Sequence, residues 1–321
     1  MKYATNEWGQ LKQVIVGIAE GARVPDIDIS VRTVNYADKA DISEIQTGPY
    51  PEQVIQEAHE DLETFCDFLR GESVEVLRPE PMPTGYYHYC PRDVAFVHGD
   101  LAMATPMPIQ ARHNDYKGLL PHIQDLKIPG RCTTEDLYNL NCVGDPDTLA
   151  LTELAPAFDA ANAIRADEHV LYLISNSGNR AGAQLLQEYL GNTAQVHTLA
   201  GVYSYMHIDS TVAFLREGLM LLNPSRIKSV NQLPEPFCKW EVIWCAEPEP
   251  ISYYGNYCNA SNWINMNLFS VNSQLVALEQ HQHSLRKQLE AHGIECAMLP
   301  MRHQRTLGGG FHCVTLDTKR C

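Results

Sequence analysis

Residues 307–315, close to the C-terminus, read LGGGFHCVT. Three consecutive glycines can adopt positive φ and let the backbone approach a neighbouring group closely, so Gly308, Gly309 and Gly310 predict a tight turn that presents Cys313. The alternative interpretation is a glycine-rich turn before a last buried strand, because free cysteine is among the most buried residue types. The stretch alone leaves both interpretations open.

Two stretches nearer the middle of the chain carry the groups that an activated thiol needs. The segment FDAAN contains Asp159, and the segment MHIDST contains His207 and Asp209. An imidazole that is close to a thiol and to a carboxylate is the arrangement that generates a cysteine nucleophile. A lone His-x-Asp sequence is also common on protein surfaces. The combination with Cys313 is therefore what favours a catalytic site over a solvated pair.

FDAAN, MHIDST and GGGFHC together resemble the amidinotransferase family, and they occur in the family's order. The best-known members move an amidino group from arginine to glycine or to other amines. Shorter matches extend the resemblance nearly from end to end: NEWG at 6–9, CPRD at 90–93, NPSR at 223–226 and NW at 262–263. The resemblance implies a single domain over residues 1–321 with the pentein fold, a five-bladed α/β propeller of ββαβ units with pseudo-fivefold symmetry around a central channel.

The resemblance also implies a role for each site residue. Cys313 would be the nucleophile, His207 the group that moves protons, and Asp159 the carboxylate that orients His207 and stabilises its charged form. Asp93 and Asp209 would grip the arginine guanidinium, whose N–H groups suit carboxylates. The remaining substrate contacts would be Arg226, which would hold the substrate carboxylate, together with Met206, Ser261 and Thr315.

Several of these residues also have a simpler interpretation. Asp93, which follows Pro91-Arg92, could cap a turn, and Arg226 could be a solvated loop residue. His303 and His312 are expected to be structural or exposed, although both lie near the nucleophile in the sequence.

The composition narrows the classes of function. The chain of 321 residues is 45% hydrophobic and carries a formal net charge of −15, with 24 scattered lysines and arginines. Phosphate binding needs clustered cations, so the sequence predicts neither nucleic-acid nor membrane binding. The N-terminus lacks the apolar run of a signal peptide, no stretch nears 18 apolar residues, and we expect a cytoplasmic protein. An acidic surface would suit a cationic substrate.

The ten cysteines include no CxxC pair, which is consistent with reduced thiols in a cytosolic setting. The histidines form no HExxH pattern, and no cysteine cluster has zinc spacing, so we predict no metal. The glycine run lacks the Lys-Ser/Thr of a phosphate-binding loop, and we expect no other cofactor.

Apolar spacing predicts the elements of the fold. Helices followed by strands are expected at 51–69 and 74–77, at 181–190 and 196–199, and at 276–291 and 294–299. The paired runs 93–98 with 101–104 and 211–215 with 219–222 predict hairpins. Residues 11–17 read as a buried strand, residues 18–50 as a long ordered loop of the kind that lines a site, and residues 105–147 as a loop without an assigned chemistry. Strand, strand, helix, strand is the expected repeat.

The sequence departs from the family pattern at three places. Asn162 stands where many members carry a second Asp, Ser204-Tyr205 replaces the Asn-Pro of the creatine-pathway enzymes, and Val314 and Leu316 replace the usual Trp and Cys after the nucleophile. The second change borders the acceptor space, so glycine is not the expected acceptor. These departures favour a bacterial secondary-metabolite or toxin pathway over creatine synthesis.

The leading hypothesis is therefore an arginine-dependent amidinotransferase. Cys313 would attack L-arginine, L-ornithine would leave, and an acceptor amine would take the amidino group from the cysteine. One alternative is a deiminase-type hydrolase of the same superfamily. Another is a protein that binds arginine without turnover, which retention of Cys313, His207 and Asp159 disfavours. The expected partners are these small molecules, and the sequence leaves the oligomeric state open, a homodimer included.

Overall fold

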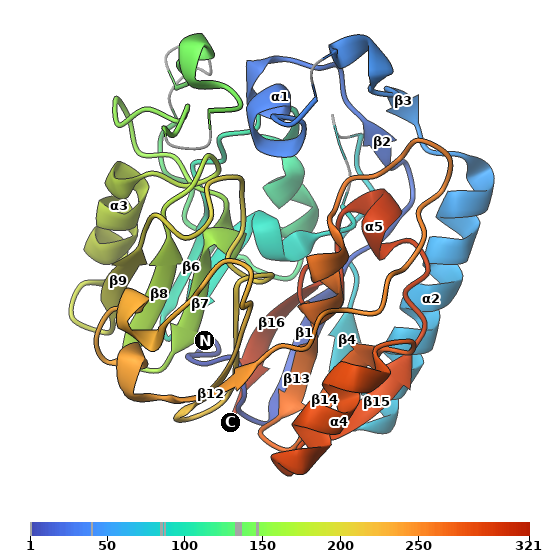
Figure 1. The fold of residues 1–321 in the computed structure, drawn as a ribbon, viewed down its shortest axis with the longest axis vertical. Coiled ribbons are helices and arrows are strands. Elements are labelled where there is room, and N and C mark those ends of the chain that lie inside the picture. The colour runs from blue at the N-terminus through green and yellow to red at the C-terminus, as the bar shows by residue number, and fades with distance from the viewer. Residues whose placement is uncertain (1, 40, 84–85, 87, 132–136, 146–147) are drawn as a thin grey trace.

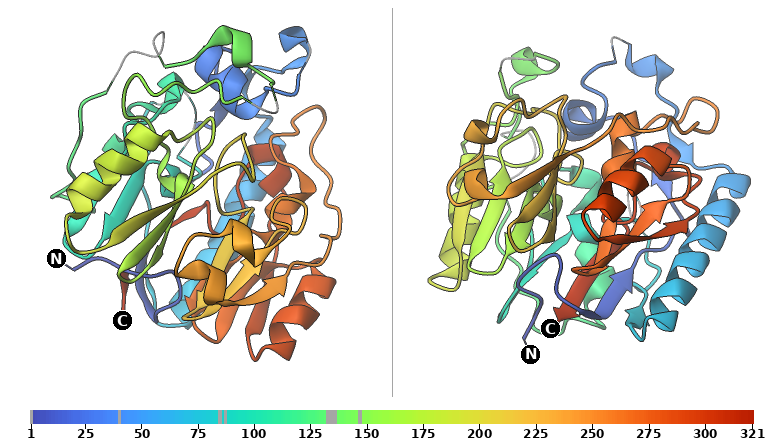
Figure 2. Two further views of the ribbon diagram at one scale, coloured as in Figure 1. Left: turned by 60° about the vertical axis from the view of Figure 1, so that its left-hand side comes forward. Right: turned by 60° about the horizontal axis from the view of Figure 1, so that its bottom comes forward.

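Five of the six small sheets surround a common centre (Figures 1 and 2). The computed structural model describes residues 2–39, 41–83, 86, 88–131, 137–145 and 148–321. Helices α2 (Glu52–Gly71) and α3 (Arg180–Leu190) lie at opposite outer edges of the molecule in Figure 1. This arrangement is the predicted five-bladed pentein fold.

The two ends of the chain share one sheet, which closes the ring. Strand β1 (Leu11–Val16) pairs antiparallel with β16 (Thr315–Arg320) and parallel with β4 (Glu75–Leu77). The N- and C-termini accordingly lie close together in every view (Figures 1 and 2). The predicted strand at 11–17 is confirmed. Cys313 lies two residues before β16, an edge strand of this sheet that pairs with β1.

Two blades have the full ββαβ order. In one, β7 (Ala163–Ala166) and β8 (His169–Leu173) precede α3 and β9 (Gln195–Leu199). In the other, β13 (Phe269–Asn272) and β14 (Leu275–Glu279) precede α4 (His283–Ala291) and β15 (Glu295–Leu299). In both blades the first two strands are antiparallel and the last two are parallel.

The predicted helix at 276–291 is wrong over its first residues. Residues 276–279 belong to β14, and α4 begins at His283. Val276, Ala277 and Leu278 are all fully buried, because β14 lies between β13 and β15. A continuous apolar run is compatible with a buried strand or with a buried helix, and periodicity does not separate the two.

The remaining two blades lack the helix. Strands β10 (Val212–Arg216), β11 (Leu219–Leu222) and β12 (Glu241–Trp244) form one sheet, with only the 3-10 turns η8 (Val230–Gln232) and η9 (Phe237–Lys239) in the crossover. Strands β5 (Ala95–His98) and β6 (Leu101–Ala104) form a two-stranded sheet. Lys127 makes a parallel bridge to Met103 where the other blades have a third strand. Both predicted hairpins are confirmed.

The hydrophobic core lies between neighbouring blades. Phe96 of β5 and Met103 of β6 pack in one buried cluster with Tyr172 of β8, and Leu221 of β11 packs in another with Leu278 of β14. Burial of apolar surface contributes about 25 cal/mol per Å² to the stability of the fold, and it therefore holds each blade against the next. The blades leave a polar centre, which the site uses.

The segments between the blades contain more structure than expected. Residues 18–50, expected to be a loop, include helix α1 (Ile29–Asn35), the turn η1 (Ile42–Glu44) and the short pair β2 (Arg23–Val24) with β3 (Gly48–Pro49). Asp28 caps α1, because its side chain accepts a hydrogen bond from Val31 N at 2.9 Å. The segment 105–147 contains η3 (Gln110–Arg112), η4 (Asp115–Leu119) and η6 (Leu140–Cys142). Cys132, in the same segment, lies outside the described residues.

Within the described ranges, no helix combines the length and the apolar character that crossing a membrane requires. The cysteines there are free thiols.

Candidate active site

The glycine run turns the chain from helix α5 (Gln304–Leu307) into β16. Gly308 has φ of 78°, in the left-handed region that favours glycine. A Cβ at Gly309 would lie 2.5 Å from the sulfur of Cys90, so no side chain fits there. The turn both precedes the last buried strand and presents Cys313, so the two interpretations of the sequence describe one feature.

Neighbouring side chains hold this turn in place. Asn267 Oδ1 accepts hydrogen bonds from the backbone N–H groups of His312 and Cys313, at 2.9 and 3.1 Å. The ring of Phe311 packs edge to face on Phe65 of α2, with centroids 4.9 Å apart. The position of the thiol is thus fixed from both sides of the turn.

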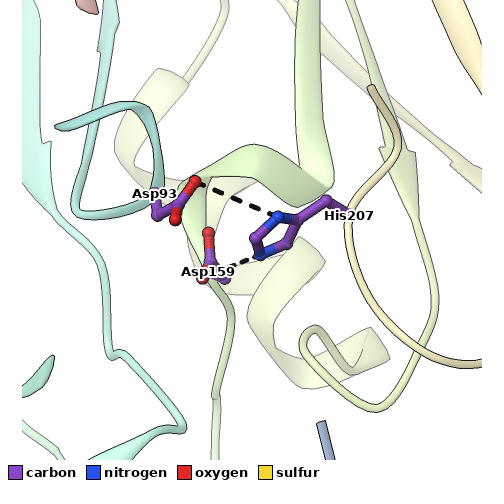
Figure 3. A group of neighbouring side chains, drawn as sticks. All are labelled: Asp93, Asp159 and His207. Carbon is purple, nitrogen blue, oxygen red and sulfur yellow. Dashed lines mark ion pairs between the residues drawn. The ribbon is translucent and has the colours of Figure 1, made fainter. Parts of the chain in front are cut away.

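His207 lies between two carboxylates (Figure 3). Its Nε2 is 2.9 Å from Asp159 Oδ2, and its Nδ1 is 3.9 Å from Asp93 Oδ1. Asp159 begins the turn η7 (Ala160–Asn162), where its Oδ1 accepts from Ala161 N at 3.0 Å. Burial opposes the charged imidazole, but Asp159 and Asp93 outweigh it and raise the pKa of His207 to about 10. At neutral pH His207 is therefore a cation with a proton to donate.

Asp93 ends the turn η2 (Pro91–Asp93) and is paired with a cation that the sequence did not single out. Arg112 Nη1 contacts Asp93 Oδ2, while Arg112 Nε is 3.0 Å from Asp115 Oδ2. The segment 105–147 thus contributes Arg112 to the site. Burial and Asp159 raise the pKa of Asp93 to about 6, although Arg112 acts in the opposite direction. Among the described residues, no hydrogen-bond donor reaches Asp93 Oδ1.

The thiol of Cys313 lies against Asp209. Its sulfur is 3.2 Å from Asp209 Oδ2, and the same oxygen is 3.2 Å from His312 Nδ1. A hydrogen bond with the thiol of Cys90, burial and the charge of Asp209 raise the pKa of Cys313 well above its ordinary value. The resting group is therefore a thiol. A cysteine can be activated by a pKa lowered beside a cationic imidazole or by deprotonation as substrate binds, and the second route fits this geometry.

Arg226 is held in place by hydrogen bonds and by an aromatic ring. Its Nη1 donates to Ser210 O at 3.0 Å, to Ser210 Oγ at 2.8 Å and to Thr211 Oγ1 at 2.7 Å. Its guanidinium stacks on Tyr203 at 3.4 Å from the ring centroid. Such an arginine is oriented before a ligand arrives and is not a freely solvated side chain.

A cavity of about 420 Å³ brings most of the predicted residues together. Its lining includes Met206, His207, Asp209, Arg226, Ser261 and Cys313. Val34, Asn35, Asp38 and Lys39 also line it, as expected for the segment 18–50. Asp93 lines a smaller adjoining space together with Met206 and His207.

Asp159 and Thr315 line neither of these two spaces. Asp159 is fully buried behind His207. Thr315 is buried on β16, where its hydroxyl donates to the carbonyls of Phe311 and His312 at 3.0 and 2.8 Å. This places Thr315 under the nucleophile turn, where it fastens the backbone.

Asp93, Asp159 and His207 also form the one group with metal-ligand geometry among the described residues, with donor atoms within 4.8 Å of one another. These side chains neutralise each other, and Arg112 pairs with Asp93. A metal would have to displace the proton of His207, whose pKa is raised to about 10. We retain the prediction that the site uses no metal or other cofactor.

The pentein fold, with a thiol, an imidazole and several carboxylates around its central cavity, agrees with what the resemblance to the amidinotransferases implies. No protein-family model matches the chain. Over 98% of its length the chain is 38% identical to inosamine-phosphate amidinotransferase 1 of Streptomyces glaucescens, and the match covers 95% of that protein. The L-arginine:L-lysine amidinotransferase of Pseudomonas savastanoi pv. phaseolicola is 29% identical over 98% of the chain and 93% of that protein.

The solved structure of the inosamine-phosphate amidinotransferase of Streptomyces griseus superposes with a TM-score of 0.94 and 37% identity, covering 100% of this chain and 97% of that one. The chain therefore belongs to the amidinotransferase family, and it is an enzyme of that transferase class.

Proposed function

We propose that the enzyme transfers the amidino group of L-arginine to an acceptor amine, through an amidino-thioether on Cys313, and releases L-ornithine. The observation that carries this proposal is the one cavity that is lined by Cys313, Asp209 and Arg226 together with His207. The name of the Pseudomonas relative, which includes L-arginine, supports the choice of donor.

The cavity suits arginine at both of its ends. The guanidinium would lie between Asp209 and the unoccupied Oδ1 of Asp93, which accepts no hydrogen bond from the described residues. Carboxylates on both sides would localise its charge and leave the central carbon open to the sulfur. Arg226 would pair with the carboxylate at the other end of the substrate. A guanidinium at Asp209 would also replace the thiol as hydrogen-bond donor, which favours loss of the Cys313 proton.

In the first half-reaction, the sulfur of Cys313 forms a bond to the guanidinium carbon. The bond from that carbon to the ornithine nitrogen then breaks, and this nitrogen takes its proton from His207. The proton lost by the thiol restores the charge of His207, so the half-reaction is balanced. Asp159 keeps the imidazole oriented throughout.

In the second half-reaction, the acceptor amine attacks the amidino carbon and the carbon–sulfur bond breaks. His207, which is protonated after the first half-reaction, gives its proton to the departing sulfur and takes the surplus proton of the amine, so Cys313 returns as a thiol. The relatives differ in acceptor by name, so family membership alone does not identify it. We place the reaction in bacterial secondary-metabolite biosynthesis, because Ser204 and Tyr205 replace the Asn-Pro expected of the glycine-using members.

Product analysis separates transfer from hydrolysis. The enzyme is incubated with L-arginine, with and without a panel of primary amines that includes lysine, glycine and an aminocyclitol phosphate. Ornithine and a guanidinylated amine, both absent in the Cys313→Ala variant, are the expected products. Citrulline and ammonia in the absence of an amine would instead support a deiminase, and binding of arginine without any product would support the non-catalytic alternative.

A further inference from the structure

A chain of buried charges lies directly below the cavity and ends at the nucleophile. It begins with Glu7, in the NEWG segment, to which the function proposed above gives no role. Glu7 forms a two-pronged ion pair with Arg165, with Nε–Oε1 at 2.8 Å and Nη2–Oε2 at 3.0 Å. Glu7 Oε2 is also 3.3 Å from His312 Nε2. The N-terminal segment therefore contacts the residue that precedes Cys313.

His312 connects Glu7 to Asp209. Its Nδ1 is 3.2 Å from Asp209 Oδ2, and that oxygen is 3.2 Å from the sulfur of Cys313. Each ring nitrogen thus faces a carboxylate oxygen. A neutral imidazole has one N–H and one lone pair, so only the cation satisfies both contacts as a donor. The arrangement therefore favours a positively charged His312.

Asp209 depends on this cation. Asp209 is 4% exposed, and burial without a partner would favour its protonated form. Burial raises the pKa of Asp209, but the hydrogen bond and the charge of His312, followed by the charge of His207 and a hydrogen bond with Cys313, hold it well below its ordinary value. The charged and titratable groups around His312 are Glu7, Asp209 and Cys313, with Arg92 and Arg165 behind Glu7.

We propose that His312, anchored by Glu7, is a positioning residue that keeps Asp209 ionised and fixed beside the sulfur of Cys313. The proposal rests on the function proposed above, in which Asp209 receives the guanidinium. It replaces the expectation that His312 is a structural or exposed residue, because its ring contacts the carboxylate that touches the nucleophile. It also gives the conformation of the first residues of the chain a part in catalysis.

Alkylation of Cys313 tests the proposal without arginine. The thiolate displaces chloride from 2-chloroacetamidine, a cation, or iodide from iodoacetamide, which is neutral; a carbon–sulfur bond forms and the thiol proton passes to the buffer. Both rates are followed by mass spectrometry with peptide mapping to Cys313. The ratio of the two rates reports the negative charge at Asp209, because general changes in thiol reactivity cancel.

Two substitutions of His312 separate its contact with Asp209 from its contact with Glu7. The side-chain amide of His312→Asn places an N–H near the position of Nδ1, toward Asp209, whereas that of His312→Gln places one near Nε2, toward Glu7. We expect the ratio to fall about tenfold or more in His312→Gln, as for loss of a hydrogen bond to a charged group, and to fall less in His312→Asn, which removes the positive charge but keeps an N–H toward Asp209. A role confined to anchoring Glu7 would give the opposite order.

Glu7→Gln supplies an independent test. It should lower the ratio in the parent protein and have no further effect when combined with His312→Gln, because Glu7 acts through His312. The matched control is His303→Asn, since His303 is also buried against a carboxylate, 2.8 Å from Glu57, but does not touch Asp209. It should leave the ratio unchanged.

An unchanged ratio in both His312→Gln and Glu7→Gln, or a larger loss in His312→Asn than in His312→Gln, would overturn the proposal. Thermal melting identifies any variant that fails to fold, and the nearly isosteric Glu7→Gln then carries the test. Failure of the proposed function looks different: the parent protein would prefer the cationic reagent, yet would form no adduct with L-arginine.

Discussion

Replacement of Asp159 by asparagine removes the carboxylate whose Oδ2 lies 2.9 Å from His207 Nε2. Two unit charges about 4 Å apart interact by about 4 kcal/mol at the effective dielectric constant of a protein, which corresponds to about three pKa units. Burial lowers the pKa of His207, and Asp159 is the largest of the effects that raise it to about 10. In Asp159→Asn we expect this pKa to return to about 7 or below.

The consequence for catalysis follows from the proton that His207 supplies. A neutral imidazole cannot protonate the leaving nitrogen, so the first half-reaction at pH 8 should slow by about 10² to 10⁴-fold. The assay is an NMR titration of ring-labelled histidine, with the His207 signal assigned by its loss in His207→Asn, combined with rapid-quench measurement of ornithine release. The control is Asp167→Asn, which changes an exposed carboxylate that accepts hydrogen bonds from the side chains of Thr5 and Asn6.

The same ion pair links stability to pH. The folded-state pKa of His207, about 10, lies above its unfolded value of about 6.5. The pair therefore contributes its full stability below about pH 6.5 and loses that contribution as the pH rises through about 10. The difference in melting temperature between the parent and Asp159→Asn should shrink over this range. A His207 signal that titrates near 10 in both proteins would refute the assignment of Asp159 as its main partner.

Three further outcomes are expected. In a Cys313→Ser background, where turnover stops, the affinity for arginine measured by calorimetry should fall as the pH drops through about 6, because Asp93 then takes up a proton; a flat profile would contradict a guanidinium contact at Asp93. In the same background Arg112→Gln should weaken arginine binding about tenfold at pH 7. The pH below which affinity falls should also rise, because Arg112 lowers the pKa of Asp93; an unchanged pH dependence would show that Arg112 does not act on Asp93. Gly309→Ala should cost about 1–3 kcal/mol in urea unfolding, because its Cβ would lie 2.5 Å from a buried sulfur, whereas Gly71→Ala, with nothing within 4 Å of its Cβ, should be nearly neutral; equal effects would show that the turn has room.

Local patterns in the sequence predicted the hairpins and most helix–strand units, because short apolar runs and helical spacing of apolar residues can be recognised within a few neighbouring residues. The same reasoning placed a helix at 276–279, since a strand buried on both faces carries a continuous apolar run like a buried helix. Helix α1 was missed because its seven residues are too few to show a clear period. The circular arrangement came from the family resemblance, and local spacing contains no signal for it.

The candidate site, like the fold, could be predicted from the sequence only in part. The nucleophile, the imidazole and the carboxylates stand in recognisable motifs, and the structure brings Cys313, His207 and Asp209 to one cavity. Arg112 gave no motif, and the only available clue was that a buried carboxylate such as Asp93 needs a cation. Glu7 and His312 are 305 positions apart, and no spacing rule joins them. Contacts made by closure of the ring are visible only once β1 and β16 are paired.

The central claim is that Cys313 carries the amidino group during the reaction. The most direct test is the intact mass of the protein after incubation with L-arginine alone, followed by peptide mapping and then by addition of an acceptor amine. We predict a gain of about 42 Da, the mass of one amidino unit in this covalent mechanism, located on Cys313, released by the amine and absent in Cys313→Ala. Formation of ornithine and a guanidinylated amine without any mass gain at Cys313, or with the gain on another residue, would contradict the account.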